Sequence, residues 1–236
     1  MKMEKIYNKG QARLFENRFL EIFTKTHPLV IWGMYGPLII FLIFYSSAFK
    51  NVALLSLILS FLSGVLFWTF FEYCIHRFAF HFIASSKRLK RVVYVLHGNH
   101  HEYPRDKERL FMPPLPSLVI AAVVFLVIFF TSKMAGINEF SFSFFAGFVM
   151  GYLLYGSMHY AIHAWNPPFK WMKPLWRNHH LHHYKQQEKG FGVSSTLWDH
   201  VFGTMFDLEK EKEDKEKVRE LMFNTPKSPK GDFDVQ

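Results

Sequence analysis

Four long apolar stretches divide the chain: residues 29–49, 52–71, 115–131 and a fourth from Phe142 to the region of Tyr160. The first two come close to the roughly 20 residues that an α-helix needs to cross a bilayer, and the third, of about 17, only just spans it. Buried helices of a soluble protein could explain one such stretch, but not four. The pattern predicts an all-α, polytopic membrane protein with four transmembrane helices in two hairpins.

The polar segments indicate which side of the membrane they occupy. Lys and Arg are frequent in residues 1–27, in residues 77–109 and after Pro167, whereas the connections 50–51 and 132–141 carry one Lys each. The positive-inside rule therefore places both termini and the long middle loop in the cytosol. The formal net charge is +9, but the basic residues lie between apolar stretches, which favours contact with lipid headgroups over a nucleic-acid-binding surface.

Composition agrees with lipid contact, because half of the 236 residues are hydrophobic and 28 are Phe. Near the N-terminus, Phe15, Phe19 and Phe23 are spaced i, i+4, i+8, which places their rings on one helix face. This spacing predicts an amphipathic helix that either lies at the membrane surface or packs against the protein's own cytosolic part.

Three regions are expected along the chain. Residues 1–27 form the interfacial segment, residues 28–206 form the membrane domain, and residues 207–236 form a charged, partly disordered tail. In the fourth apolar stretch, Gly147 and Gly151 form a small-xxx-small pattern that would let another helix approach closely.

Most of the 13 histidines lie in short groups near the cytosolic ends of the spans. A dry cluster of so many imidazoles would be unstable without a bound partner, which favours a metal site. Ten rings exceed the four to six positions of one ion, so two ions are the natural number. The expected ligands are His76, His81, His97, His100, His101, His159, His163, His179, His182 and His183.

The spacing of these histidines suggests how they act. The trio at 97, 100 and 101 and the trio at 179, 182 and 183 both follow i, i+3, i+4, so each would share one helix face and cap one metal. His76 and His81 are five residues apart, which is a rotation of about 140° on an α-helix. Either the helix ends between them, or each serves a different metal.

Three other histidines fall outside this set. His180 lies off the face shared by its neighbours, so we expect it to support a ligand or to face solvent. His27 and His200 lack nearby histidine partners. Glu72, one turn before His76, would accept a ring N–H or cap a buried helix end.

The chemistry of the expected site is open to alternatives. Imidazole suits Zn, Cu, Fe and Ni, and affinity order does not choose among them. A two-metal centre at the end of a helical bundle suits oxidation of an unactivated C–H bond in a lipid, which requires a redox metal, dioxygen and two electrons. A membrane protein that stores or moves zinc is the alternative from another class, although transporters place their ligands near the bilayer midplane.

The order of the histidine motifs resembles the fatty acid hydroxylase superfamily of membrane di-metal oxygenases. The flanking residues resemble its fatty acid 2-hydroxylase branch, and the resemblance covers roughly residues 60–206. The matching residues are Glu72-Tyr73, His76-Arg77-Phe78, Phe80-His81, His97-Gly98-Asn99-His100-His101, Pro104, Asp106, Arg109-Leu110, Met112-Pro113-Pro114, Gly190 to Ser195, Leu197-Trp198-Asp199 and Val201 to Thr204.

This resemblance implies a four-helix membrane domain beneath a cytosolic cap, in which the ten histidines hold two metals. Iron is expected for activity, with zinc possible in purified protein, and O2 is the oxidant. The implied reaction is hydroxylation of a long acyl chain at carbon 2, either in a free fatty acid or in a sphingolipid. A hydroxylase or desaturase of another lipid, such as a sterol or carotenoid, is the alternative.

Two departures from the family pattern bear on this prediction. The 27 leading residues are too short for the N-terminal cytochrome b5 domain of many relatives and lack its His-Pro-Gly-Gly haem motif. Electrons are therefore expected from a separate donor of the cytochrome b5 or ferredoxin type, in the bacterial inner membrane or the endoplasmic reticulum. In addition, Gly156 follows Tyr155 where the family usually has an acidic residue.

Overall fold

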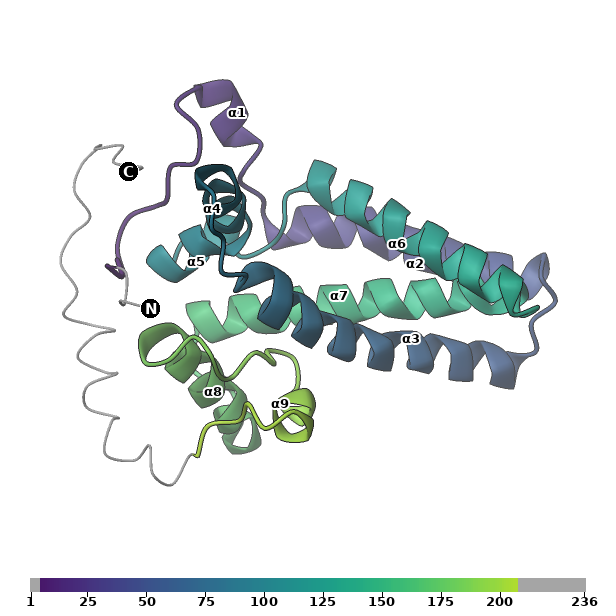
Figure 1. Cartoon of the computed structure of the whole chain (residues 1–236). Helices are drawn as coiled ribbons and strands as arrows, with labels where there is room; N and C mark the ends of the chain where they lie inside the picture. Colours follow the sequence, from purple (N-terminus) through teal and green to yellow (C-terminus); the bar gives the residue numbers. More distant parts are fainter. Residues whose placement is uncertain (1–4, 208–236) are drawn as a thin grey trace.

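The computed structural model describes residues 5–207, and every regular element in that range is helical (Figure 1). Almost all of the expected tail, residues 207–236, lies outside the described residues. The elements in order are α1 (Arg18–Ile22), α2 (Pro28–Ala48), α3 (Leu54–Cys74), η1 (Ile75–Phe80), α4 (Lys87–Val93), η2 (Tyr94–Gly98), α5 (Asn99–Glu102), η3 (Lys107–Arg109), α6 (Pro114–Met134), η4 (Asn138–Phe140), α7 (Ser141–Ala164), η5 (Lys170–Met172), α8 (Lys173–Tyr184) and α9 (Leu197–Val201).

Four of these helices, α2, α3, α6 and α7, are long and apolar enough to cross a membrane. They coincide with the four predicted stretches, which confirms the all-α fold with four membrane-length helices. The helices lie side by side, and two short connections join them into hairpins (Figure 1). Asn51 supplies the reversal after α2 with a φ of 51°, and Gly136 supplies the one after α6 with a φ of 72°.

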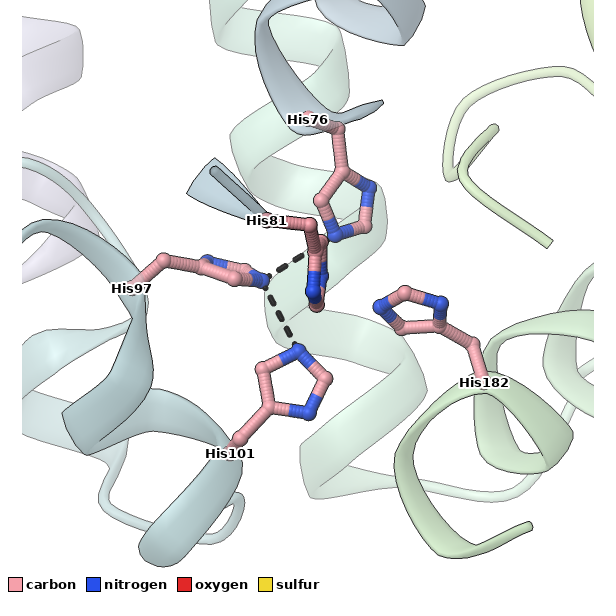
Figure 2. Close-up of side chains that lie close together, drawn as sticks. All are labelled: His76, His81, His97, His101 and His182. Carbon is pink, nitrogen blue, oxygen red and sulfur yellow. Dashed lines mark hydrogen bonds between the residues drawn. The ribbon is translucent and has the colours of Figure 1, made fainter. Parts of the chain in front are cut away.

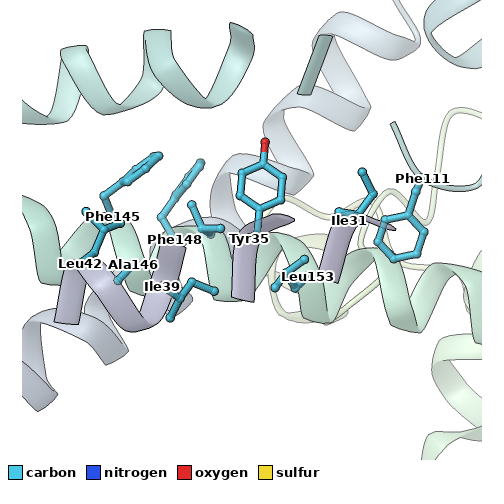
Figure 3. Close-up of a cluster of buried hydrophobic side chains, with 10 residues drawn as sticks. Ile31, Tyr35, Ile39, Leu42, Phe111, Phe145, Ala146, Phe148 and Leu153 are labelled. Carbon is cyan, nitrogen blue, oxygen red and sulfur yellow. The ribbon is translucent and has the colours of Figure 1, made fainter. Parts of the chain in front are cut away.

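Helix α7 is the central helix of the bundle. More than half of the apolar segment of α7 is buried inside the bundle, compared with 28% of that of α2 and smaller shares of those of α3 and α6. Along α2, Ile31, Tyr35, Ile39 and Leu42 recur every three or four residues and pack against the face of α7 that carries Leu153 (Figure 3). The resulting core fixes the position of the α7 end that carries two of the predicted ligands.

The contact between α3 and α7 is closer still, because glycines remove the side chains between the two backbones. A Cβ atom at Gly147 would lie 1.9 Å from the Phe61 carbonyl oxygen, and one at Gly64 would lie 2.0 Å from the Phe144 carbonyl oxygen. A Cβ atom at Gly151 would lie 2.4 Å from Trp68 Cβ. The prediction that Gly147 and Gly151 admit another helix is therefore confirmed.

The N-terminal segment differs from the long amphipathic helix that the Phe spacing predicts. Asn17 caps a helix of only five residues, so Phe15 precedes it. The rings of Phe19 and Phe23 are exposed and pack against each other, with their centroids 4.9 Å apart. Before the helix, Tyr7 is buried and its backbone N–H donates to the Glu102 carbonyl oxygen. The segment thus packs against the cap and also exposes an apolar face.

The close approach of α3 and α7 generates a prediction for stability. Changing Gly147→Ala places a methyl group against backbone that cannot move aside, which should cost about 1–3 kcal/mol. We expect a lower midpoint of thermal unfolding for the detergent-purified protein. Gly33→Ala on α2 is the control, because no described atom lies within 4 Å of an added Cβ there. An equal loss in both variants would contradict the close contact.

Candidate metal centre

The ten predicted ligands gather at one end of the bundle, although they come from five separate helical segments. They form two groups, and within each group one ring nitrogen per histidine lies within 4.8 Å of all the others. The first group is His76, His81, His97, His101 and His182 (Figure 2). The second group is His100, His159, His163, His179 and His183.

A π-helical turn brings His76 and His81 into the same group. Helix α3 continues into η1, where the wider turn allows the His81 N–H to donate to the His76 carbonyl oxygen five residues earlier, at 3.3 Å. On an α-helix these side chains would diverge. The helical segment instead ends at Phe80, between the two residues, as one of the two alternatives expected, and the other alternative, a different metal for each ring, is wrong.

The expectation that each trio caps one metal is wrong. His97 and His101 lie in the first group, whereas His100, between them, lies in the second. In the other trio, His182 belongs to the first group and its partners at 179 and 183 belong to the second. The rings of one trio therefore point to two neighbouring centres.

Backbone carbonyl groups hold several rings in one orientation. His76 Nδ1 lies 2.5 Å from the Phe191 carbonyl oxygen, and His182 Nδ1 lies 2.7 Å from that of Lys189. In the second group, His159 Nδ1 lies 3.4 Å from the Leu110 carbonyl oxygen. A carbonyl can only accept, so each Nδ1 carries the proton and each Nε2 presents a lone pair to its group.

The nitrogens that converge are spaced as metal ligands are. His97 Nε2 lies 3.0 Å from both His76 Nε2 and His101 Nε2, as the dashed lines in Figure 2 mark. In the second group, His179 Nε2 lies 2.9 Å from His163 Nε2 and 3.1 Å from His183 Nε2. Two nitrogens at about 2.1 Å from one ion and at right angles to each other are about 3.0 Å apart.

Other ring nitrogens of the first group have no hydrogen-bond partner among the described residues. His81 Nε2 and His182 Nε2 are buried and have no hydrogen-bond partner among residues 5–207. A buried polar atom without a partner costs free energy, and a cation at the centre of the first group, to which both atoms belong, would satisfy these lone pairs. Together with the spacing of the nitrogens in the second group, this shows that the residues present fit a metal ion in each group.

Burial keeps the rings neutral, as ligands must be. It lowers the pKa of His182 to about 3, with the neighbouring His81 ring adding to the shift. Burial also lowers the pKa values of His101, His179 and His183 well below the usual 6.5, and nearby rings add to each shift. At neutral pH these four imidazoles are thus unprotonated and able to bind a metal.

The histidines left outside the ligand set have other surroundings. His180 belongs to neither group, but its ring lies 6.4 Å from that of His163. The His27 side chain accepts from the Leu29 N–H and caps α2, and His200 is exposed. Glu72 accepts from Val193 and Ser194 and not from a ring N–H, so the expectation of a direct bond to a histidine is wrong.

A cavity of about 650 Å³ leads from the bundle to both groups. His97 of the first group and His100 and His159 of the second line its inner end. Its walls are mostly apolar and reach as far as Val124 on α6 and Phe148 on α7. No sequence pattern indicates this cavity, because its lining comes from every span and from the N-terminal segment.

Four membrane-length helices with two buried histidine groups at one end define a multi-pass membrane protein with a centre that could hold two metal ions. The chain belongs to the fatty acid hydroxylase family, whose sequence model matches residues 61–204. This is a metal-dependent family of oxidoreductases, and the matched range contains all ten histidines of the two groups.

The relatives are hydroxylases of acyl chains. The chain is 38% identical to a ceramide very long chain fatty acid hydroxylase of Saccharomyces cerevisiae, over 84% of this chain and 50% of the relative. It is 33% identical to a dihydroceramide fatty acyl 2-hydroxylase of Arabidopsis thaliana, over 82% and 79%. With the fatty acid 2-hydroxylase of Mus musculus the identity is 35%, over 84% and 57%. The chain thus spans half the length of the yeast relative.

A solved structure is also similar. The structure of full-length scs7p, in which only the hydroxylase domain is visible, aligns with a TM-score of 0.75 and 36% identity. The alignment covers 84% of this chain and 73% of that one. The helical fold described above is therefore the fold of that domain.

The division into two groups predicts the metal content of variants. His101→Ala removes a ligand of the first group, and His183→Ala removes one of the second, so each purified variant should lose about one of two bound ions. Elemental analysis after loading with cobalt(II) measures this. The exposed His200→Ala should keep both ions. If either ligand variant also kept both, the assignment to two groups would be wrong.

Proposed function

We propose that this protein hydroxylates a long acyl chain at carbon 2, either in a free fatty acid or in the N-acyl chain of a sphingolipid. The names of the relatives support this reaction, since they include two fatty acyl 2-hydroxylases and a ceramide hydroxylase. On this proposal the ten histidines are the metal ligands, and residues 28–206 form the hydroxylase domain.

The observation that carries the proposal is the path of the cavity. Its wall is mostly apolar, as an acyl chain requires, and its inner end contacts histidines of both groups. A chain in this cavity would be shielded from water and would place one end beside the pair of ions.

The cavity also distinguishes its two ends. Thr24, Asn99 and Arg109 line it near the cap, whereas Ala121 and Val124 line it within the span of α6. The polar end of a lipid would therefore lie towards the cap, and its tail would lie between the helices. Carbon 2 is adjacent to the carbonyl carbon, so this orientation brings it towards the histidines.

The pair of ions would supply the redox chemistry and oxygen activation that side chains cannot. Iron and O2 are the proposed reactants at the centre, and a separate protein of the cytochrome b5 or ferredoxin type would supply two electrons. In the proposed orientation, both termini and the histidine groups face the cytosol. The membrane is that of the endoplasmic reticulum or a bacterial inner membrane. The proposal involves no nucleic acid. The charge of the loops supports the orientation.

Product analysis tests the proposed function. Membranes that contain the chain, iron, an electron donor and ¹⁸O2 should form 2-hydroxy acyl lipids labelled with ¹⁸O, as measured by mass spectrometry. Membranes with His182→Ala should form at least 100-fold less, because the first group loses a ligand. An absent product, or oxygen placed in a sterol or at another carbon, would contradict the proposal.

A second prediction tests the cavity and leaves the ligands unchanged. Ala121→Trp puts a large ring into the cavity, so hydroxylation of long chains should fall at least 10-fold while both metal ions remain bound. Val123→Trp is the matched control, because Val123 is 56% exposed on the outside of α6 and does not line the cavity. Similar activity in the two variants would show that substrate binds elsewhere.

A further inference from the structure

The loop of residues 189–195 lies between two buried carboxylates and the first histidine group. Glu72 on α3 and Asp199 on α9 are both buried, at 5% and 0% exposure. Neither carboxylate bonds to a histidine, although both bond to the loop that contacts the first group. The role of these carboxylates at the site rests on the proposed metal binding.

The N–H groups of this loop face the carboxylates. Asp199 accepts from Phe191 N at 2.9 Å and from Gly192 N at 2.8 Å. Glu72 accepts from Val193 N at 2.7 Å and from Ser194 N at 3.0 Å. The loop is therefore fixed to α9 at one point and to α3, one turn before His76, at another.

The carbonyl groups of the same loop face the histidines. The Phe191 carbonyl oxygen accepts from His76 Nδ1, and the Lys189 carbonyl oxygen accepts from His182 Nδ1. These bonds leave the Nε2 atoms of both rings free for a metal. The loop thus connects the carboxylates to two of the five histidines in the first group.

One peptide unit makes this connection directly. The C=O of Phe191 and the N–H of Gly192 belong to the same peptide, so His76 bonds to one side of it and Asp199 to the other. A negative charge at the N–H polarises the peptide and strengthens its carbonyl as an acceptor. The carboxylate therefore favours a proton on His76 Nδ1 without touching the ring.

The surroundings of Asp199 support an ionised carboxylate. Besides the two loop N–H groups, Thr204 Oγ1 donates to it at 2.7 Å and Asn178 Nδ2 at 3.3 Å. All four partners donate, and each carboxylate oxygen accepts two of these bonds, which is the pattern of a charged group.

Gly192 allows this close arrangement. A Cβ atom at residue 192 would lie 2.9 Å from Asp199 Oδ2 and 2.1 Å from the Ser195 carbonyl oxygen. A side chain there would push the loop away from the carboxylate, so only glycine fits between them.

We propose that Asp199 is a positioning residue for the first metal: through the peptide between Phe191 and Gly192, it fixes His76 with its proton on Nδ1 and its Nε2 directed to the ion. Direct histidine–carboxylate pairs at metal sites act in the same way, and here one peptide unit is inserted. Glu72 holds the remainder of the loop against α3.

The test is the number of ions that the full-length purified protein binds. Asp199→Asn has nearly the same shape but no charge, so the affinity of the first group for cobalt(II) should fall about 10–100-fold, as for other changes outside the ligand set. At a free cobalt(II) concentration that just saturates both groups of the wild type, the variant should hold one ion and the wild type two. Adding His183→Ala should remove the remaining ion, because that ligand belongs to the second group.

Thr204→Val is the matched control, since it removes one bond to Asp199 but keeps the charge and both loop contacts. It should bind two ions. The proposal is overturned if Asp199→Asn binds two ions with unchanged affinity, if it loses both, or if the double variant keeps one. Failure of the wild type to bind a pair of ions would instead contradict the proposed function.

A second measurement covers the case in which Asp199→Asn does not fold. In the metal-free wild-type protein labelled with ¹⁵N-histidine, nuclear magnetic resonance should show His76 protonated on Nδ1, and folded Asp199→Asn should show a shift towards Nε2. Protonation of His76 on Nε2 in the wild type would overturn the proposal.

Discussion

The structure depends on one electrostatic constraint: ten imidazoles are brought together without a carboxylate among them. Their nitrogens approach to 2.9–3.1 Å in several pairs, and burial keeps rings such as His182 uncharged. Two lone pairs at such distances repel each other unless a proton or a cation lies between them, and a metal ion in each group would remove that repulsion. The remainder of the fold holds these rings in place against that repulsion.

The bundle meets the constraint through close helix contacts. Gly64 and Gly147 bring the backbones of α3 and α7 together, which sets the distance between the ends that carry His76 and His159. Helix α6 is much less buried than α7. The cavity along it is therefore bordered by a tightly packed pair of helices on one side and by a looser helix on the other. Such an arrangement can admit a lipid chain without disturbing the ligands.

Outside the bundle, the supporting interactions are made by backbone. Carbonyl groups of residues 110, 189 and 191 orient three ligand rings, and the two buried carboxylates act on the loop that supplies two of those carbonyls. Buried polar groups thus satisfy one another in sequence: the imidazoles donate to loop carbonyl groups, and the N–H groups of the same loop donate to the carboxylates. Gly156 stands where the resemblance leads us to expect an acidic residue, and the ring of Phe111 would lie 2.2 Å from a Cβ atom at this position. An aromatic ring occupies that space.

The sequence by itself determined the four spans and the set of ten histidines, because both are local properties: apolar runs of bilayer length, and imidazoles too numerous for other use. It did not determine how the set divides. His100 and His182 join groups opposite to those of their neighbours, and His81 joins His76 only because α3 widens into a π-helical turn. The loop carbonyls and the cavity also carry no sequence signal, since backbone atoms look alike at every residue. Only the packing of distant segments decides which carbonyl meets which ring, and that is why the tertiary structure was needed to pair the ligands.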